Sequence, residues 1–407
     1  MTKQVKPDIE TFARIRVIGV GGSGGNAINH MISSHVQGVD FISVNTDAQD
    51  LHKSKSKRRI HIGKTLTRGL GTGMNADMGR QAADETREEI QDALKGSDMV
   101  FITCGMGGGT GTGAAPIIAK IARELGALTV GVVTRPFGFE GAQRMRLAEH
   151  GMSELRKAVD ALIIIPNDKL LAIVSRETGI KNAFAMCDDI LKQAVEGISD
   201  LITTTGIINV DFADVRTIMQ NAGSALMGIG IASGEKRAEV AARNAINSPL
   251  LEVSINGAKG VLFSIAGGDD LGMLEVQDAA NVITEAIDPD AKVIFGAVTD
   301  GSLKKGEVRV TVIATGFPEG ARVSLFPASS RLAAKKDKDV PPVSRSITND
   351  EDEKVVEPEK ATDSSHQKPA KEKNGKDASK HSGRGNAESV SPDDETWSGL
   401  PSFLRRK

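Results

Sequence analysis

Two glycine-rich segments are the clearest candidates for binding chemistry in this chain. Residues 19–26 read GVGGSGGN and residues 105–113 read GMGGGTGTG. Each follows an aliphatic run typical of a buried strand and precedes a stretch typical of a helix. Glycine leaves backbone N–H groups unobstructed, and a helix N-terminus favours an anion, so both segments are suited to binding phosphate. A tight structural turn is an alternative for the first segment, but the six glycines of the second argue against an ordinary connection.

A third segment, residues 69–75 with the sequence GLGTGMN, also stands before a predicted helix. It could close over a terminal phosphate, and two phosphate-binding segments from one sheet indicate a polyphosphate ligand. A Walker-type P-loop is excluded by spacing. Gly63, Lys64 and Thr65 resemble the end of that motif, but Arg58 occupies the position where it requires glycine.

The spacing of Gly19, Gly21 and Gly24 matches the G-x-G-x-x-G pattern of dinucleotide-binding folds. That class also expects an acidic residue about twenty positions further on, and Asp47 roughly satisfies this. The pattern is weak by itself and gives the second glycine segment no role. A Rossmann-type oxidoreductase is therefore an alternative of a different class.

Short aliphatic runs alternate with amphipathic stretches up to about residue 318, which predicts an α/β fold with a parallel, Rossmann-like sheet. Strands are expected at 15–20, 41–44, 99–103, 128–133 and 161–165, and helices at 27–33, 77–94, 115–125 and 143–159. Pro116 is expected in the first turn of its helix, where its missing N–H costs nothing.

A long helix is predicted at 181–201, because its apolar residues recur at spacings of three, four and seven. It would join the first domain to a smaller α/β domain with a mixed sheet. Strands of that domain are expected at 225–231, 260–265, 291–298 and 307–315, and helices at 235–246 and 274–287.

Composition excludes several classes of protein. The 51 Lys and Arg residues nearly balance the 53 Asp and Glu residues, so there is no global positive field and nucleic acid is not an expected partner. Cys104 and Cys187 are too few for a disulfide framework and suit a reducing compartment. Residues 1–10 lack the apolar core of a signal peptide. Residues 99–119 carry no charge, but their six glycines and Pro116 argue against a membrane span.

The second glycine segment resembles the signature loop of tubulin, and the surrounding sequence is similar to the bacterial cell-division members of the tubulin/FtsZ family of GTPases. The resemblance covers about residues 13–318 and the last dozen residues. The other stretches that carry it read VNTD at 44–47, NDKL at 167–170, NVDFADV at 209–215 and PSFLR at 401–405.

This resemblance implies that the cofactor is GTP or GDP with Mg²⁺, with a monovalent cation also possible. Phosphate contacts would come from the two glycine segments, the terminal phosphate would be sensed by the third, and Asn45 and Asp47 would lie near the nucleotide, Asp47 as a metal neighbour. The implied phosphate-binding residues are Gly22, Ser23, Gly24, Asn26, Gly71, Thr72, Gly73, Gly107, Gly108, Gly109, Thr110, Gly111, Thr112 and Gly113.

The resemblance also implies which residues contact the sugar and the base of the nucleotide. The segment beginning at Thr134 would lead to Glu140 at the ribose and Arg144 at the phosphates. On the sequence alone, the favoured interpretations are a surface carboxylate for Glu140 and a helix-face charge for Arg144.

Guanine would be read by Asn167 and Asp188, with Phe184 stacked on the ring. A carboxylate accepts from guanine N1–H and its amino group but finds no such donors on adenine, so GTP should be strongly preferred over ATP. Asp189 is also a candidate for that role, and Cys187 departs from the family pattern.

Hydrolysis would depend on Asn209, Asp211 and Asp214, which resemble a catalytic loop that acts in trans. Head-to-tail stacking would bring this loop to the GTP of the next subunit, so that filament assembly and hydrolysis are coupled. Two alternatives are open: Asp211 and Asp214 are turn and cap residues, or the chain is a nucleotide-binding scaffold that assembles without useful turnover.

The last residues differ from the polar, aromatic-poor stretch before them, which cannot bury enough apolar surface to fold and is expected to be disordered. They resemble a peptide that binds an actin-like membrane tether and other division proteins, so membrane association would be indirect and the location cytoplasmic, at midcell. Trp397 and Gly399 depart from the family's usual residues. The implied partner-binding residues are Trp397, Leu400, Pro401, Phe403, Leu404 and Arg405.

The expected domain organisation follows from these observations. A flexible arm (1–12) precedes a GTP-binding domain (13–180), a central helix (181–205) and a C-terminal activation domain (206–318). A disordered linker (319–392) and the partner-binding peptide (393–407) complete the chain.

Overall fold

The computed structural model describes residues 13–171, 179–204, 206–251, 254–301 and 303–317, all of which belong to one compact unit. Its first part is built on six parallel strands in the order β3-β2-β1-β4-β5-β6. The middle strands are aliphatic along their whole length because helices cover both faces of the sheet. The strands are β1 (Ile15–Val20), β2 (Val39–Asn45), β3 (Arg58–His61), β4 (Met99–Gly105), β5 (Leu128–Arg135) and β6 (Ala161–Pro166).

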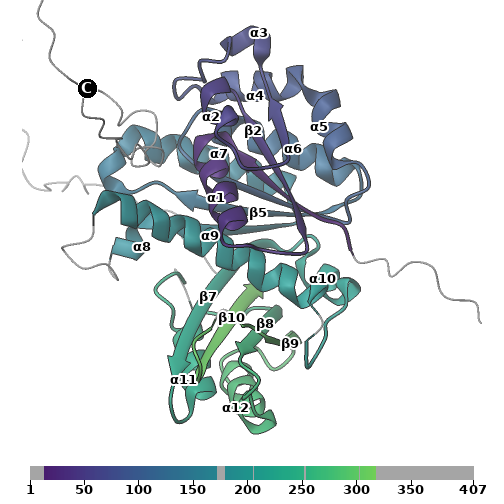
Figure 1. Cartoon of the computed structure of the whole chain (residues 1–407), viewed down its shortest axis with the longest axis vertical. Helices are drawn as coiled ribbons and strands as arrows, with labels where there is room; N and C mark the ends of the chain where they lie inside the picture. The colour runs from purple at the N-terminus through teal and green to yellow at the C-terminus, as the bar shows by residue number, and fades with distance from the viewer. Residues whose placement is uncertain (1–12, 172–178, 205, 252–253, 302, 318–407) are drawn as a thin grey trace, which may run out of the picture. The chain divides into compact units, whose positions relative to one another are not determined.

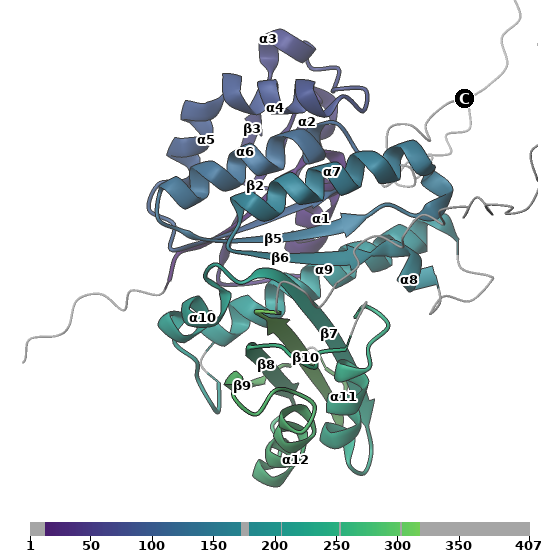
Figure 2. The same cartoon turned by 180° about the vertical axis from the view of Figure 1, so that it is seen from behind.

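Two layers of helices cover this sheet. Figure 1 shows α1 and α9 in front of it, and the reverse view in Figure 2 shows α4, α6 and α7 on the other side. Each layer has its own buried core: Ile28 and Leu191 belong to the first, Ile90 and Ile118 to the second. The helices are α1 (Gly21–Ser33), α2 (Ala48–His52), α3 (Lys64–Thr67), α4 (Ala76–Glu85), α5 (Arg87–Leu94), α6 (Thr110–Glu124), α7 (Ala142–Ala158) and α8 (Asn167–Leu171), with a 3-10 turn η1 (Gly138–Glu140).

The predicted long helix is α9 (Ile180–Thr203). Leu191, Val195 and Ile198 are fully buried along one face, in the same core as Leu262 and Ile313 of the strands that follow. The helix therefore packs against elements of both parts of the fold.

The second part is a smaller α/β region with the mixed sheet that the sequence predicts. Its strands lie in the order β7-β10-β8-β9, antiparallel except for the parallel pair β8 and β9, and β7 continues the first sheet beside β6. Ala242 and Ile283 belong to a separate core on one face of this sheet. The elements are α10 (Phe212–Met219), β7 (Gly223–Ser233), α11 (Arg237–Ile246), β8 (Gly260–Gly267), α12 (Met273–Thr284), β9 (Lys292–Thr299) and β10 (Glu307–Thr315).

Two expectations about the helices are wrong. The helix expected at 77–94 is two helices, broken at Thr86, whose hydroxyl donates to Ala82 O and accepts from Gly63 N. Pro116 lies inside α6 and not in its first turn, because the glycine segment itself forms the start of that helix at Thr110. Likewise α1 begins within the first glycine segment, at Gly21.

The uncharged stretch at 99–119 forms β4 and most of α6. Among the described residues, none of the helices has the length and apolar character needed to cross a bilayer.

Helices α4 and α6 approach each other so closely that a side chain cannot fit between them. A methyl group on Gly113 would lie 1.9 Å from Ala76 O and 2.7 Å from Arg80 N, both backbone atoms. We therefore expect Gly113→Ala to lower the free energy of unfolding by about 2 kcal/mol or more, the usual cost of overpacking. Denaturant unfolding of the nucleotide-free protein measures this.

Gly25→Ala is the matched control, because Gly25 is also helical and a methyl group there meets no atom within 4 Å. Its stability should be unchanged or slightly higher, since alanine favours helix over glycine. Equal destabilisation by the two variants would contradict close packing of α4 on α6.

Candidate functional site

The two glycine segments meet at the carboxyl edge of the parallel sheet. They follow β1 and β4, which are adjacent strands whose connections leave to opposite faces, the position where open α/β sheets bind ligands. A methyl group on Gly21 would lie 3.2 Å from Gly111 N and 3.3 Å from Thr110 Cβ. The structure thus brings together the two segments that the sequence singled out.

A chain of hydroxyl groups ties the third segment to this pair. Thr110 Oγ1 lies 2.7 Å from Thr46 Oγ1 and 3.3 Å from Thr72 Oγ1, and all three residues are buried. A methyl group on Gly109 would overlap Thr72 Oγ1, which shows how closely the segments pack. Thr46 was not predicted from the sequence as a residue of the site. Its position between Asn45 and Asp47, at the end of β2, is a signal that could have indicated this role.

Several glycines of the site leave open space beside the backbone. A methyl group on Gly71, Gly73 or Gly108 would meet no atom within 4 Å. Thr112, by contrast, is turned inward: its Oγ1 accepts from Gly107 N at 2.9 Å. The second segment is therefore braced from within while part of its backbone stays accessible to an anion.

Asn45 and Asp47 are held in place by local hydrogen bonds. Asn45 Nδ2 donates to Asp50 Oδ2 at 2.9 Å, and its Oδ1 accepts from Asp47 N. Asp47 Oδ1 accepts from Gln49 N and from Asp50 N, so this carboxylate caps the N-terminus of α2. Within the described ranges, His, Cys, Asp and Glu do not form any group of three suited to a metal ion.

Glu140 and Arg144 form a buried pair beside the second glycine segment. Their side chains are 5% and 18% exposed, and Glu140 Oε2 lies 3.1 Å from Arg144 Nε. Glu140 Oε1 also accepts from Phe137 N, and a methyl group on Gly107 would lie 2.7 Å from Arg144 Cγ. The interpretation of Glu140 as an ordinary surface carboxylate is wrong.

Two polar groups, one directly after β6 and one in the first half of α9, are candidates for contact with a ligand. Asn167 is 4% exposed, and its Oδ1 has no hydrogen-bond partner among the described residues. Burial raises the pKa of the Asp188 carboxyl to about 7. Phe184, one turn before Asp188 on α9, packs edge-to-face on Phe137 with ring centroids 5.4 Å apart. Leaving such groups unpaired is costly, so their arrangement favours a polar planar ligand.

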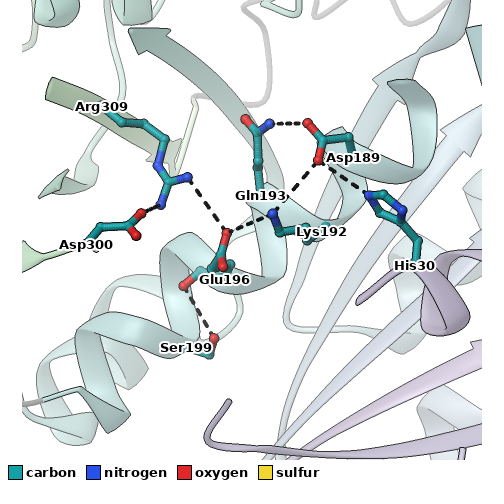
Figure 3. A network of polar contacts seen from close by, with 8 residues as sticks. All are labelled: His30, Asp189, Lys192, Gln193, Glu196, Ser199, Asp300 and Arg309. Carbon is teal, nitrogen blue, oxygen red and sulfur yellow. Dashed lines mark hydrogen bonds and ion pairs between the residues drawn. The ribbon is translucent and has the colours of Figure 1, made fainter. Parts of the chain in front are cut away.

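Asp189, the other candidate of the pair, is already engaged. Figure 3 shows it between His30 of α1 and the next turn of its own helix. Its Oδ1 lies 3.4 Å from His30 Nε2 and 3.9 Å from Lys192 Nζ, while Gln193 Nε2 donates to its Oδ2 at 2.5 Å.

The segment at 209–214 lies just before α10. Asn209 Oδ1 accepts from Gly206 N, and Asp211 Oδ1 accepts from Asp214 N, so Asp211 is the N-cap of α10. Both aspartates are exposed. In the isolated subunit, Asp211 therefore acts as a helix cap, which is one of the two alternatives that the sequence left open.

Comparison with known proteins identifies the fold's relatives. The tubulin/FtsZ family GTPase domain matches residues 14–175, and the FtsZ family C-terminal domain matches residues 223–318. An empty FtsZ dimer structure from M. jannaschii is 47% identical, with a TM-score of 0.73, over 75% of this chain and 89% of that one. The chain belongs to the tubulin/FtsZ family of GTPases.

Two more distant structures share the fold. CetZ2 from Haloferax volcanii, in a structure described as a GTPγS-bound protofilament, is 22% identical with a TM-score of 0.64, over 76% of this chain and 95% of that one. CetZ1 from the same organism, described as a GDP-bound monomer, is 21% identical with a TM-score of 0.66, over 76% of this chain and 96% of that one.

Family membership confirms the predicted α/β fold and the GTPase activity. The roles of individual site residues stay predictions, as do the domain boundaries and a bacterial origin. The residues expected to bind partners lie outside the described part of the chain: Trp397, Leu400, Pro401, Phe403, Leu404 and Arg405.

The raised pKa of Asp188 predicts a pH dependence for guanine nucleotide binding by this GTPase. Only the deprotonated carboxylate accepts from guanine N1–H, so affinity is present above the free protein's pKa of about 7 and is lost as pH falls through it. Between pH 6 and pH 8 the charged fraction, and with it the affinity for GDP, should rise about tenfold. Equilibrium titration with a fluorescent GDP analogue measures this.

Asp189→Asn is the matched control, because Asp189 is held by partners within the protein. Any pH dependence that comes from the nucleotide phosphates themselves would affect this variant and the Asp188 variant alike. It should keep the wild-type pH profile, while Asp188→Asn binds more weakly with a flattened profile. The opposite result would assign the base contact to Asp189.

Proposed function

We propose that this GTPase assembles head-to-tail into filaments of the cytokinetic ring and hydrolyses GTP at a composite site between consecutive subunits. It would act in the cytoplasm at the midcell division site. Its C-terminal peptide would recruit division proteins, including an actin-like membrane tether. The relatives described as a dimer and a protofilament support the self-association in this proposal.

Within one subunit, the nucleotide would lie across the β1/β4 switch point. The open glycine backbone would take the phosphates, Arg144 would add positive charge, and Glu140 would face the ribose. Asn167 and Asp188 would read the guanine edge against Phe184. Among the described residues Asn167 Oδ1 has no hydrogen-bond partner, and burial raises the pKa of the Asp188 carboxyl; both observations support this assignment, since guanine would supply hydrogen-bond donors to each of them.

The position of α10 is the observation that carries the composite site. Arg216 of α10 donates to Gly126 O, directly before β5, so this helix lies at the amino edge of the sheet. The glycine segments lie at the carboxyl edge, and the eight residues of β5 place its two ends about 23 Å apart. Asp211 and Asp214 therefore cannot reach the nucleotide of their own subunit, but a stacked neighbour could present them to it.

Exposed apolar residues occur near both of these edges. Leu70, next to the nucleotide segments, is 83% exposed, and Ile207, just before the proposed catalytic loop, is 59% exposed. Burial of such residues in a repeated contact would favour association. Because the two surfaces differ, such a contact would be heterologous and would not close into a two-fold dimer, and with a rotation that does not close into a ring it would generate a filament.

In the composite site, Asp211 and Asp214 would orient and polarise the attacking water, and Asn209 would hold the loop. A Mg²⁺ ion would neutralise charge on the phosphates. The residues present fit an ion held chiefly by phosphate oxygens and water, the usual way magnesium binds at nucleotides, because Asp47 is the candidate ligand at the site and one of its oxygens caps α2.

Removing one carboxylate of the catalytic loop should separate hydrolysis from binding. We expect Asp214→Ala to bind GTP and to assemble, measured by light scattering, while phosphate release falls about 100-fold, a typical loss for a water-positioning group. Asp84→Ala, at an exposed carboxylate on α4, is the control and should keep wild-type turnover. A folded Asp214→Ala protein that no longer binds GTP would contradict action in trans.

Specificity provides a second test, at the base. Asp188→Asn replaces an acceptor by an amide that can pair with xanthine, so the variant should prefer XTP over GTP. Phosphate release with each nucleotide measures the switch, which should exceed about tenfold because buried unpaired groups penalise the wrong base strongly. Asp189→Asn should still prefer GTP. An unchanged preference in Asp188→Asn would remove this residue from base recognition.

A further inference from the structure

Asp168 is a carboxylate beside the nucleotide crevice to which the proposed function gives no role. It directly follows Asn167 in α8, and it is exposed. Its Oδ1 accepts from Gly138 N of the turn η1 at 2.8 Å. Gly138 and Asp168 are 30 residues apart in the chain, so this hydrogen bond joins the segment that carries Asn167 to the segment that leads to Glu140.

The hydrogen bond lies just beyond the carboxyl ends of two neighbouring strands. Strands β5 and β6 are parallel, and Arg135 stands opposite Pro166 at the end of their register. Gly138 is three residues past Arg135, and Asp168 is two residues past Pro166. The backbone pairing of the strands has ended there, so a side chain takes over as the acceptor for Gly138 N. The two segments therefore stay in contact on the edge of the sheet where the glycine segments lie.

The turn η1 is braced from within, because its polar groups are paired with one another. Glu140 N donates to Phe137 O at 3.0 Å, and Phe137 N donates to Glu140 Oε1 at 3.0 Å. Phe137 is also buried and stacks on Phe139, with ring centroids 5.0 Å apart. A contact that fixes Gly138, inside this turn, therefore also fixes the direction of the Glu140 carboxylate.

Two further contacts hold η1, and neither of them involves α8. The pair of Glu140 with Arg144 is local, since Arg144 belongs to the first turn of α7, which begins two residues after η1. Phe137 packs on Phe184 of α9 through an edge-to-face contact between rings. The hydrogen bond from Gly138 N is directional, so it can align η1 with α8 in a way that these two contacts do not.

Adjacency in the chain makes Asp168 a link between the base and the sugar. Asn167 and Asp168 are successive residues of α8, so a base that engages Asn167 also limits the movement of Asp168. Asp168 in turn holds η1, and η1 carries Glu140. A binding site whose groups are aligned before the ligand arrives loses less conformational entropy on binding. The hydrogen bond thus aligns two recognition groups in advance.

We propose that Asp168 is a positioning residue that couples recognition of the guanine base to recognition of the ribose. Its carboxylate holds Gly138 N, and this keeps Glu140 directed at the sugar while Asn167 contacts the base. Without this hydrogen bond, Asn167 and Glu140 can each contact the nucleotide but are no longer aligned with each other. This inference rests on the roles proposed above for Asn167 and Glu140.

Sugar discrimination by the full-length protein tests the coupling. The measured quantity is the Kd for 2′,3′-dideoxy-GDP, which lacks both ribose hydroxyls, divided by the Kd for GDP, each from competition with a fluorescent GDP analogue. We call this quotient the sugar ratio. In Asp168→Ala the sugar ratio should fall about fivefold, the effect expected from the loss of one intramolecular hydrogen bond. A general loss of stability or of folded protein acts on both ligands equally and cancels in the ratio.

Variants of the same helix separate the hydrogen bond from other effects. Asp168→Asn keeps Oδ1 as an acceptor, so it should retain most of the sugar ratio that Asp168→Ala loses. Lys169→Ala is the matched control, because it removes the next side chain of α8, which is exposed, and it should keep the wild-type ratio. Glu140→Gln changes the group proposed to face the ribose, and it should lower the ratio at least as much as Asp168→Ala.

A double-mutant cycle measures the coupling between base and sugar. Asn167→Ala removes the proposed contact to the base, and it should also lower the sugar ratio when Asp168 is present. In the Asp168→Ala background, Asn167→Ala should leave the ratio unchanged, because the link between the two segments has already been lost. Such nonadditivity is typical of residues that act through a shared contact.

Three results would overturn the inference. Equal weakening of GDP and dideoxy-GDP binding in Asp168→Ala would assign this residue a purely structural role. Additive effects of Asn167→Ala and Asp168→Ala on the sugar ratio would show that the hydrogen bond does not couple base and sugar. A sugar ratio unchanged in Glu140→Gln would remove the ribose contact itself, and the variant in which this result occurs distinguishes it from a failure of Asp168 alone.

Discussion

The close approach of backbone segments at the β1/β4 switch point is the constraint on which the rest of this structure depends. A methyl group on Gly24 would lie 2.5 Å from Thr103 O, and one on Gly19 would lie 2.3 Å from Gly24 O. The start of α1 must therefore lie directly on the ends of β1 and β4. Only with this contact can the first glycine segment turn into a helix whose N-terminus faces the crevice, and only then can the second segment and Thr72 close around the same point.

Around this crevice the protein keeps polar groups that would stabilise it more if they were paired. Asn167 Oδ1 is buried with no hydrogen-bond partner among the described residues, and the Asp188 carboxyl has a pKa raised by burial. Asp160, by contrast, is well paired: it accepts from Thr129 N and Asn221 N and lies 3.5 Å from Arg123 Nε. Unpaired groups are not confined to the crevice, since Arg156 Nη2 on α7 is also buried without a hydrogen-bond partner in the described part of the chain. For Asn167 and Asp188, a ligand that supplied the missing donors would also stabilise the folded state.

The sequence predicts those features of the fold and the site that are determined by local patterns of residues. It does not predict those that are determined by packing between distant segments. The strands β1 and β10 begin and end where the aliphatic runs predict, and the switch-point location of both glycine segments follows from the alternation of strands and helices. The start of α6 does not, because Thr112 Oγ1 and the contact with α4 extend that helix back through glycines that have poor intrinsic helix propensity. The burial of Glu140 and the hydroxyl chain through Thr46 also depend on residues far apart in the chain, and no local pattern records them. The edge strand β3 was missed because five cations precede Ile60, the one buried residue of the strand, and conceal the apolar signal of a strand.

Helix α9 connects the nucleotide crevice to the second part of the fold. In its first half Asp189 faces His30 on α1, the helix that begins in the first glycine segment. Two turns later Glu196 lies 3.8 Å from both Lys192 Nζ and Arg309 Nη1, and Arg309 in turn donates to Asp300 at 2.7 Å, the run of contacts drawn in Figure 3. A helix of 24 residues is about 36 Å long and moves as a rod, because its own hydrogen bonds resist compression. If Asp188 reads the base as proposed, a shift imposed there by a nucleotide would reach the β10 seam and the segment 209–214, which begins six residues after the end of α9. A helix that carries the proposed base-reading carboxylate in its first half and ends shortly before the proposed catalytic loop is a direct physical route by which one subunit's nucleotide could adjust the surface offered to the next.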